Sequence, residues 1–165
     1  MSLSTNLELL NGKTTDGCVA TGLHREVITV TAARTLKKEE SGALIVFDIA
    51  TGATVTLPEA EEGINFDFLV KKSISSGAAK VITGDAADFL VGAIDFGGDA
   101  NTTLTTAISA FAADGSTHVA IAGNGTTTGM KAGSSFRVVA ITGALWGING
   151  TIIGSGSVAT PFATS

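Results

Sequence analysis

Apolar and polar residues alternate along much of this chain, and the clearest alternation lies between residues 53 and 72. A short run around Val55 is followed by a turn at Pro58–Gly63 and by a longer run at Ile64–Val70. A period of two places one set of side chains on a buried face, which is typical of a half-buried strand and not of a helix. We expect the two runs to pair as a hairpin and to form the nucleus of an antiparallel β domain.

Several other stretches are rich in β-branched and aromatic residues and are bounded by turn-forming residues. Asp95–Thr103 is expected to be a surface loop, and Lys37–Glu40 one helical turn. In Thr102–Ala113 the apolar spacing would suit a helix face, but the threonines favour a strand, which we expect. Further strands are predicted at Val27–Thr31, Ala43–Ile49, Lys80–Thr83, Phe89–Ile94, His118–Ala122, Ser135–Thr142 and Trp146–Ile153.

The predicted fold is all-β: a single antiparallel β-sandwich or barrel, jelly-roll-like, with an extended N-terminal arm. A chain of 165 residues suffices for one domain with one core. Its 21 glycines and two prolines agree with many tight turns. We expect residues 1–26 to form the N-terminal arm, 27–153 the β domain, and 154–165 a flexible C-terminal tail.

Charge and hydropathy narrow the classes of partner. A net charge of −5 argues against nucleic acid, whose binding requires lysine and arginine against phosphates. The mean hydropathy is high, +0.40, but no apolar run approaches the ~18 residues of a membrane span, so we expect no membrane partner. The apolar surface is expected in a core or against other protein chains. A single cysteine excludes an intrachain disulfide, and without a recognisable signal peptide we expect the chain to stay inside the cell that makes it.

Residues suited to catalysis are few. His24 and His118 are the only imidazoles. Asp114, Ser116 and His118 supply the residue types of a catalytic triad, but such close neighbours in sequence do not reach the required geometry, so we favour a structural role. A thiol and base pair of Cys18 with His24 has no further support. The prediction is therefore a protein with no catalytic residue, not an enzyme.

Oxygen ligands for a calcium ion are available at Asp95, Asp99 and Asn101, with Asp85 and Asp88 nearby. Their spacing lacks the regular order of an EF-hand loop and its closing glutamate. Solvated turn residues are the favoured interpretation, so we predict neither a metal nor a cofactor.

Two ordered sets of turn and core residues stand out. The first consists of Arg34-Thr35-Leu36, Ser41-Gly42, Ala53–Pro58, Gly63 and the Phe66-x-Phe68 pair. The second consists of Gly133, Phe136–Ile141, Thr142-Gly143, Trp146, Gly150, Gly156 and Ala159–Ala163. Together they span residues 34–163 and resemble head decoration, or capsid cement, proteins of tailed bacteriophages, although similar motifs recur in phage tail and fibre proteins.

The resemblance implies a virion structural protein bound to the outside of an icosahedral capsid, often as a homotrimer. Its partner would be the major capsid protein, and it would be made in the host cytoplasm. Binding that favours the assembled shell over its parts stabilises the shell by mass action. The two chain ends are natural tethers, so the predicted interface anchors are Leu7, Leu9, Leu10 and Phe162.

Two other classes of function stay open. One is a phage tail-fibre or receptor-binding module that recognises host surface carbohydrate; a single tryptophan and no tyrosine provide little for the aromatic groove such a site uses. The other is an enzyme acting on a small substrate, which the two histidines make the least favoured of the three.

Overall fold

The computed structural model describes residues 24–99 and 109–165, and the fold over these residues is all-β, as predicted. One turn of 3-10 helix, η1 (Lys38–Glu40), confirms the predicted helical turn. The strands are β1 (Val27–Val30), β2 (Arg34–Thr35), β3 (Leu44–Phe47), β4 (Thr54–Thr56), β5 (Asn65–Val70), β6 (Ala79–Ile82), β7 (Phe89–Gly98), β8 (Ser109–Asp114), β9 (Ala120–Gly123), β10 (Ser135–Thr142), β11 (Leu145–Gly154) and β12 (Phe162–Ala163).

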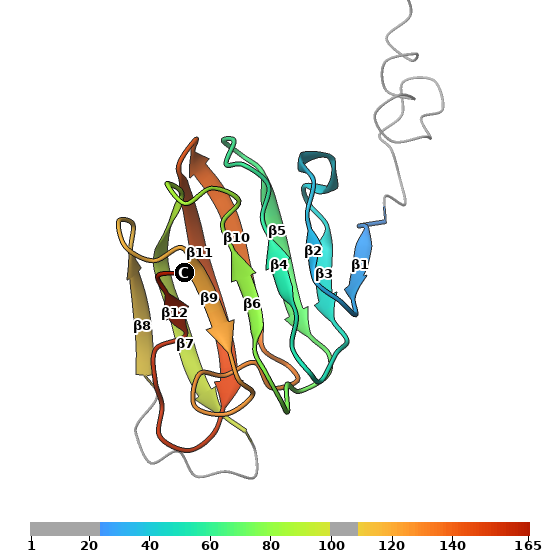
Figure 1. Ribbon diagram of the computed structural model, residues 1–165, viewed down its shortest axis with the longest axis vertical. Helices are drawn as coiled ribbons and strands as arrows, with labels where there is room; N and C mark the ends of the chain where they lie inside the picture. The colour runs from blue at the N-terminus through green and yellow to red at the C-terminus, as the bar shows by residue number, and fades with distance from the viewer. Residues whose placement is uncertain (1–23, 100–108) are drawn as a thin grey trace, which may run out of the picture.

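These strands form two sheets, neither closed into a barrel. The seven-stranded sheet has the order β1-β3-β5-β10-β11-β7-β8, and the five-stranded sheet has the order β12-β9-β6-β4-β2. Figure 1 shows the sheets as two layers, and the side chains between them form one apolar core. The arrangement is therefore sandwich-like.

Both sheets are mixed, so the predicted all-antiparallel domain is wrong. β1, β3 and β5 are parallel neighbours, and so are β2, β4 and β6 in the other sheet. β7 and β11 are also parallel. The jelly-roll-like arrangement is not confirmed.

The first six strands alternate between the two sheets. Each odd-numbered strand lies in the seven-stranded sheet and each even-numbered one in the five-stranded sheet, so the chain winds through three stacked coils. The predicted hairpin at residues 53–72 is therefore wrong, because β4 and β5 lie in opposite sheets. Val55 and Phe66 are fully buried and belong to the same core. The predicted alternation of buried and exposed residues is confirmed, but it belongs to two strands that face each other across the core and not to two hydrogen-bonded neighbours.

Aromatic rings fill the core along the seven-stranded sheet. The Phe68 ring on β5 stacks with the Phe136 ring on β10, with centroids 4.9 Å apart. The centroid of the Phe47 ring, on β3 at the other side of β5, lies 6.3 Å from that of Phe68. Gly150 on β11 is the partner of Phe136 in the ladder and has φ 151°. A Cβ there would lie 2.4 Å from the Phe136 Cα, so only glycine fits this position.

The strand predictions hold in the main, with two corrections. β7 continues to Gly98, so Asp95–Gly98 is strand and not surface loop. Phe162–Ala163 pairs with β9, so the predicted tail at 154–165 is not free throughout. In the ambiguous stretch, β8 confirms a strand from Ser109, and residues 102–108 lie outside the described residues, as do residues 1–23 of the predicted arm.

Candidate functional site

An apolar patch lies on the outer face of the seven-stranded sheet. It is formed by outward side chains of β7, β10 and β11, whose neighbours in sequence point into the core. The ladder places Val139 and Val91 on either side of Gly147, and Leu145 beside Phe89. We call this set the apolar patch: Phe89, Val91, Val139, Ile141 and Leu145.

The patch is continuous and open to solvent. Gly147 leaves room for Ile141, whose Cδ1 would lie 2.9 Å from a Cβ at that glycine. Val91 and Leu145 both approach the position of a Cβ on Gly115, at 3.4 and 3.5 Å. Ile141 is 46% exposed and the other four members are partly exposed. Contiguous apolar surface of this kind marks interaction sites more often than isolated exposed residues do.

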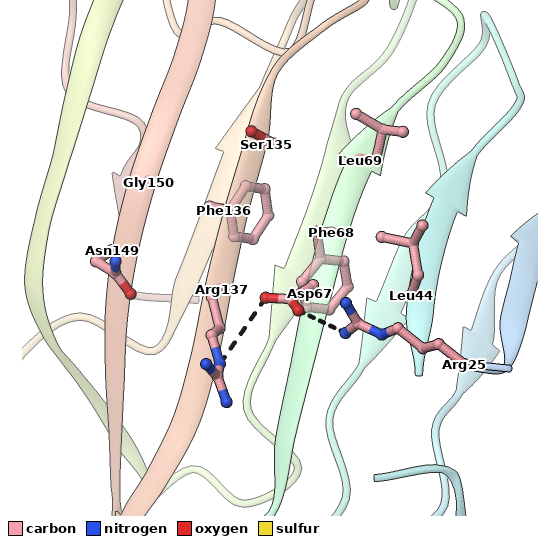
Figure 2. Close-up of a pocket in the computed structure, with 10 residues that line it drawn as sticks. All are labelled: Arg25, Leu44, Asp67, Phe68, Leu69, Ser135, Phe136, Arg137, Asn149 and Gly150. Carbon is pink, nitrogen blue, oxygen red and sulfur yellow. Dashed lines mark ion pairs between the residues drawn. The ribbon is translucent and has the colours of Figure 1, made fainter. Parts of the chain in front are cut away.

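A charged hollow lies beside the patch on the same face. Asp67, on β5, is flanked by two arginines: Arg25 Nη2 is 2.5 Å from its Oδ2, and Arg137 Nε is 3.8 Å from its Oδ1. Figure 2 shows the two guanidinium groups converging on this carboxylate from opposite sides. We call the site the arginine hollow; its volume is about 330 Å³, and Ser135 and Asn149 also line it.

Each arginine is fixed by the strands around it. Arg25, just before β1, donates from Nε to the Gly42 carbonyl at 2.5 Å and from Nη2 to the Ala43 carbonyl at 2.9 Å. Arg137 is the ladder partner of Asp67 and donates from Nη2 to Asn65 Oδ1 at 3.1 Å. Two guanidinium groups against one carboxylate leave the hollow with one excess positive charge.

The predicted triad residues form a turn. Asp114 accepts hydrogen bonds from the Ser116 and Thr117 N–H groups at 3.0 and 2.9 Å and from the Thr117 hydroxyl at 2.7 Å. The Thr117 hydroxyl, followed by the Ser116 N–H, holds the pKa of Asp114 well below its usual range. His118 Nδ1 lies 3.3 Å from Asp114, but Ser116 Oγ contacts the Thr117 hydroxyl. A contact between the serine and the imidazole, which nucleophilic catalysis requires, is not made.

The predicted calcium ligands do not converge in the described part of the chain. Asp95 is exposed on β7, Asp99 forms an ion pair with Lys131, and Asn101 lies outside the described residues. Over residues 24–99 and 109–165 no group of three or more histidine, cysteine or acidic residues is placed to hold a metal ion.

Asp88, directly before β7, is buried and contacts the loop between β4 and β5. It is 3% exposed and accepts a hydrogen bond from the Ala60 N–H at 3.3 Å. Burial raises the pKa of Asp88, an effect that the Ala60 N–H partly offsets. The Trp146 indole also favours the charged carboxylate, although its N–H lacks a hydrogen bond of good geometry.

Of the predicted anchors, Leu7, Leu9 and Leu10 lie outside the described residues. Phe162 is 6% exposed and belongs to the core of its own chain, where its ring lies 5.6 Å from that of His118. Sequence reasoning missed the arginine hollow. Its members are distant in sequence, and only the pairing of β5 with β10 brings Asp67 and Arg137 together.

Among the described residues, no helix has the length and apolar character that crossing a membrane requires. No known protein family, curated protein or solved structure matches this chain.

Proposed function

We propose that this chain is a virion structural protein that binds the outside of a phage capsid and stabilises it, with the outer face of the seven-stranded sheet as its docking surface. The observation that carries the proposal is the apolar patch on that face, open to solvent and next to the arginine hollow. The partner would be the major capsid protein, as the resemblance of residues 34–163 to decoration proteins suggests.

The size of this face suits a specific protein interface. Seven strands at about 4.8 Å spacing span roughly 29 Å, and the eight residues of β10 extend roughly 26 Å. The product, roughly 750 Å², is close to the about 800 Å² that each partner buries in a standard protein–protein interface. Apolar residues beside fixed charges also match the usual anatomy of such interfaces, where aromatic, aliphatic and arginine side chains meet.

A homotrimer is the assembly that we propose on the capsid. β1 and β8 are the edge strands of the seven-stranded sheet, so each presents backbone groups without a ladder partner in the described chain. Such edges are places where a further chain can add. Light scattering coupled to size-exclusion chromatography should give the mass of a trimer at micromolar concentration, and a stable monomer would remove this part of the proposal.

The docking face can be tested with capsids assembled without the protein. We expect saturable binding of the purified chain at a fixed copy number per capsid. Ile141→Asp places a charge in the apolar patch and should weaken binding at least tenfold, because the charge must be desolvated on docking. Thr56→Asp is the matched control, since Thr56 is partly exposed on the five-stranded sheet.

Each alternative result has a definite meaning. Absence of capsid binding by the unmodified chain contradicts the proposal, and binding to host cells in its place supports a receptor-binding module. Unchanged binding by Ile141→Asp, or a loss no greater than that of Thr56→Asp, would contradict the seven-stranded sheet as the docking face.

A further inference from the structure

We propose that the arginine hollow is a subsite for a carboxylate, supplied by an aspartate or glutamate side chain of the protein that covers the face. This inference rests on the proposed function, because it concerns what the docking partner presents. It assigns a ligand class to Arg25 and Arg137, beyond their role in holding strands together.

Unused hydrogen-bond donors are the first argument. A guanidinium carries five N–H groups. The interactions of Arg25 use Nε and Nη2, and those of Arg137 use Nη2 and, at longer range, Nε. Within the described part of the chain, Nη1 of each arginine therefore has no acceptor. Side-chain exposures of 40% and 51% leave both groups within reach of a partner.

The balance of charge on docking is the second argument. Asp67 neutralises one of the two arginines, so covering the hollow with a neutral surface would bury an uncompensated cation. Burying an unpaired charge is costly, whereas a charge that is paired and hydrogen-bonded can be accommodated. A partner that supplies one carboxylate satisfies both arginines and the free Nη1 donors, in the fork geometry that suits Arg–carboxylate pairs.

The position of the hollow supplies the third argument. Arg137, Val139 and Ile141 are alternate residues of β10, so the charge and the apolar patch follow one another along a single strand. Alternate residues of a strand are separated by roughly 7 Å. An extended segment of the partner could therefore run along β10. If it carries an acidic residue and an apolar residue two or four positions apart, the acidic side chain would reach the hollow while the apolar one rests on the patch.

Arginine side-chain NMR tests the subsite directly, because the chain has three arginines only: Arg25, Arg34 and Arg137. Arg34 is an internal control, since its guanidinium is paired with Glu40 at 2.5 Å, away from the hollow. The probe is a capped pentapeptide, acetyl-Leu-Thr-Glu-Thr-Leu-amide, whose only charge is the glutamate carboxylate. We expect it to shift the Nε–H signals of Arg25 and Arg137 and to leave Arg34 in place.

Three comparisons decide the result. The same peptide with glutamine in place of glutamate should cause no shift, and Arg137→Gln should abolish the response of Arg25 to the glutamate peptide. The proposal is overturned if the glutamine peptide causes equal shifts, if neither peptide causes a shift, or if Arg34 responds as strongly as Arg25 and Arg137. Equal shifts from acetate at the same concentration would also overturn it, and would indicate an adventitious ion only.

Capsid binding separates this inference from the proposed function. If capsids bind the unmodified chain, Arg137→Gln should weaken binding at least tenfold and reduce its dependence on salt, because a charged contact has been lost. Arg137→Lys, which keeps the charge without the fork, should retain part of the affinity. Unchanged affinity in Arg137→Gln refutes the subsite and leaves the proposed function standing. If capsids do not bind at all, the proposed function fails, and the peptide comparison still decides whether the hollow takes a carboxylate.

Discussion

Replacement of Gly150 by alanine is the sharpest test of the packing between β10 and β11. The new Cβ would lie 2.4 Å from the Phe136 Cα and 2.5 Å from the Ser135 carbonyl oxygen, so backbone must move. A positive φ costs an L-residue about 1–2 kcal/mol, and relieving the overlap of the new Cβ with the β10 backbone costs about 1–3 kcal/mol more. We expect Gly150→Ala to lower the free energy of unfolding by about 2–5 kcal/mol, a large part of the 5–15 kcal/mol typical of a domain.

Gly63→Ala is the matched control for the steric part of this effect. Gly63 also has a positive φ, 91°, but a Cβ there would meet nothing within 4 Å. It should therefore lose only the backbone contribution, about 1–2 kcal/mol. Urea denaturation followed by circular dichroism gives both values, and in a chain of this size each kcal/mol corresponds to a fall of about 2–4 °C in Tm. If Gly150→Ala is no less stable than Gly63→Ala, the close approach of β11 to Phe136 is refuted.

Three further substitutions test the core and the two perturbed carboxyl groups. Phe68→Ala should lower the free energy of unfolding by about 3–5 kcal/mol, because the ring is 1% exposed and stacks with both Phe47 and Phe136. Phe89 is only partly buried, so Phe89→Ala should cost clearly less in the same urea titration, and equal losses would contradict the assigned core. The pKa of Asp88 is raised in the folded state, so its ionisation destabilises the fold as pH rises above the ordinary value of 3.8. The difference in Tm between Asp88→Asn and the unmodified chain should therefore shift in favour of the variant between pH 4 and pH 7. The pKa of Asp114 is lowered, so its stabilisation is present above the ordinary value of 3.8 and lost as pH falls below it; Asp114→Asn should be less stable at pH 7, with a difference that shrinks toward pH 3. Tm profiles that run parallel to that of the unmodified chain would contradict either assignment.

The positions of strands could be predicted from sequence far better than their partners. A half-buried strand alternates in the same way whether its neighbour in sequence pairs with it or faces it across the core. The run at Val55 and the run at Phe66 illustrate this: both alternate and both are buried, but the turn between them carries the chain from one sheet to the other. Parallel coils therefore leave no local signature that distinguishes them from hairpins.

The candidate site was hidden for a related reason. Asp67 and Arg137 occupy ordinary outward positions of two strands, and their contact depends on a ladder between segments far apart in sequence. The role predicted for Phe162 was wrong because the strand that contains it is very short. Two residues of strand are too short to give a period, so an apolar residue in a glycine-rich tail looked free to bind a neighbour, although it packs in its own core.

If a carboxylate of a partner binds in the arginine hollow as proposed, the guanidinium of Arg25 links its binding to the integrity of the chain's first coil. This side chain joins the segment before β1 to the carbonyls of Gly42 and Ala43 and to the carboxylate of Asp67, so it bridges three consecutive strands of the sheet. A ligand that engages Arg25 binds only while this outermost coil is closed. Thermodynamic linkage then requires that occupancy suppress opening of the coil, and that a chain with a frayed first coil hold its partner less tightly.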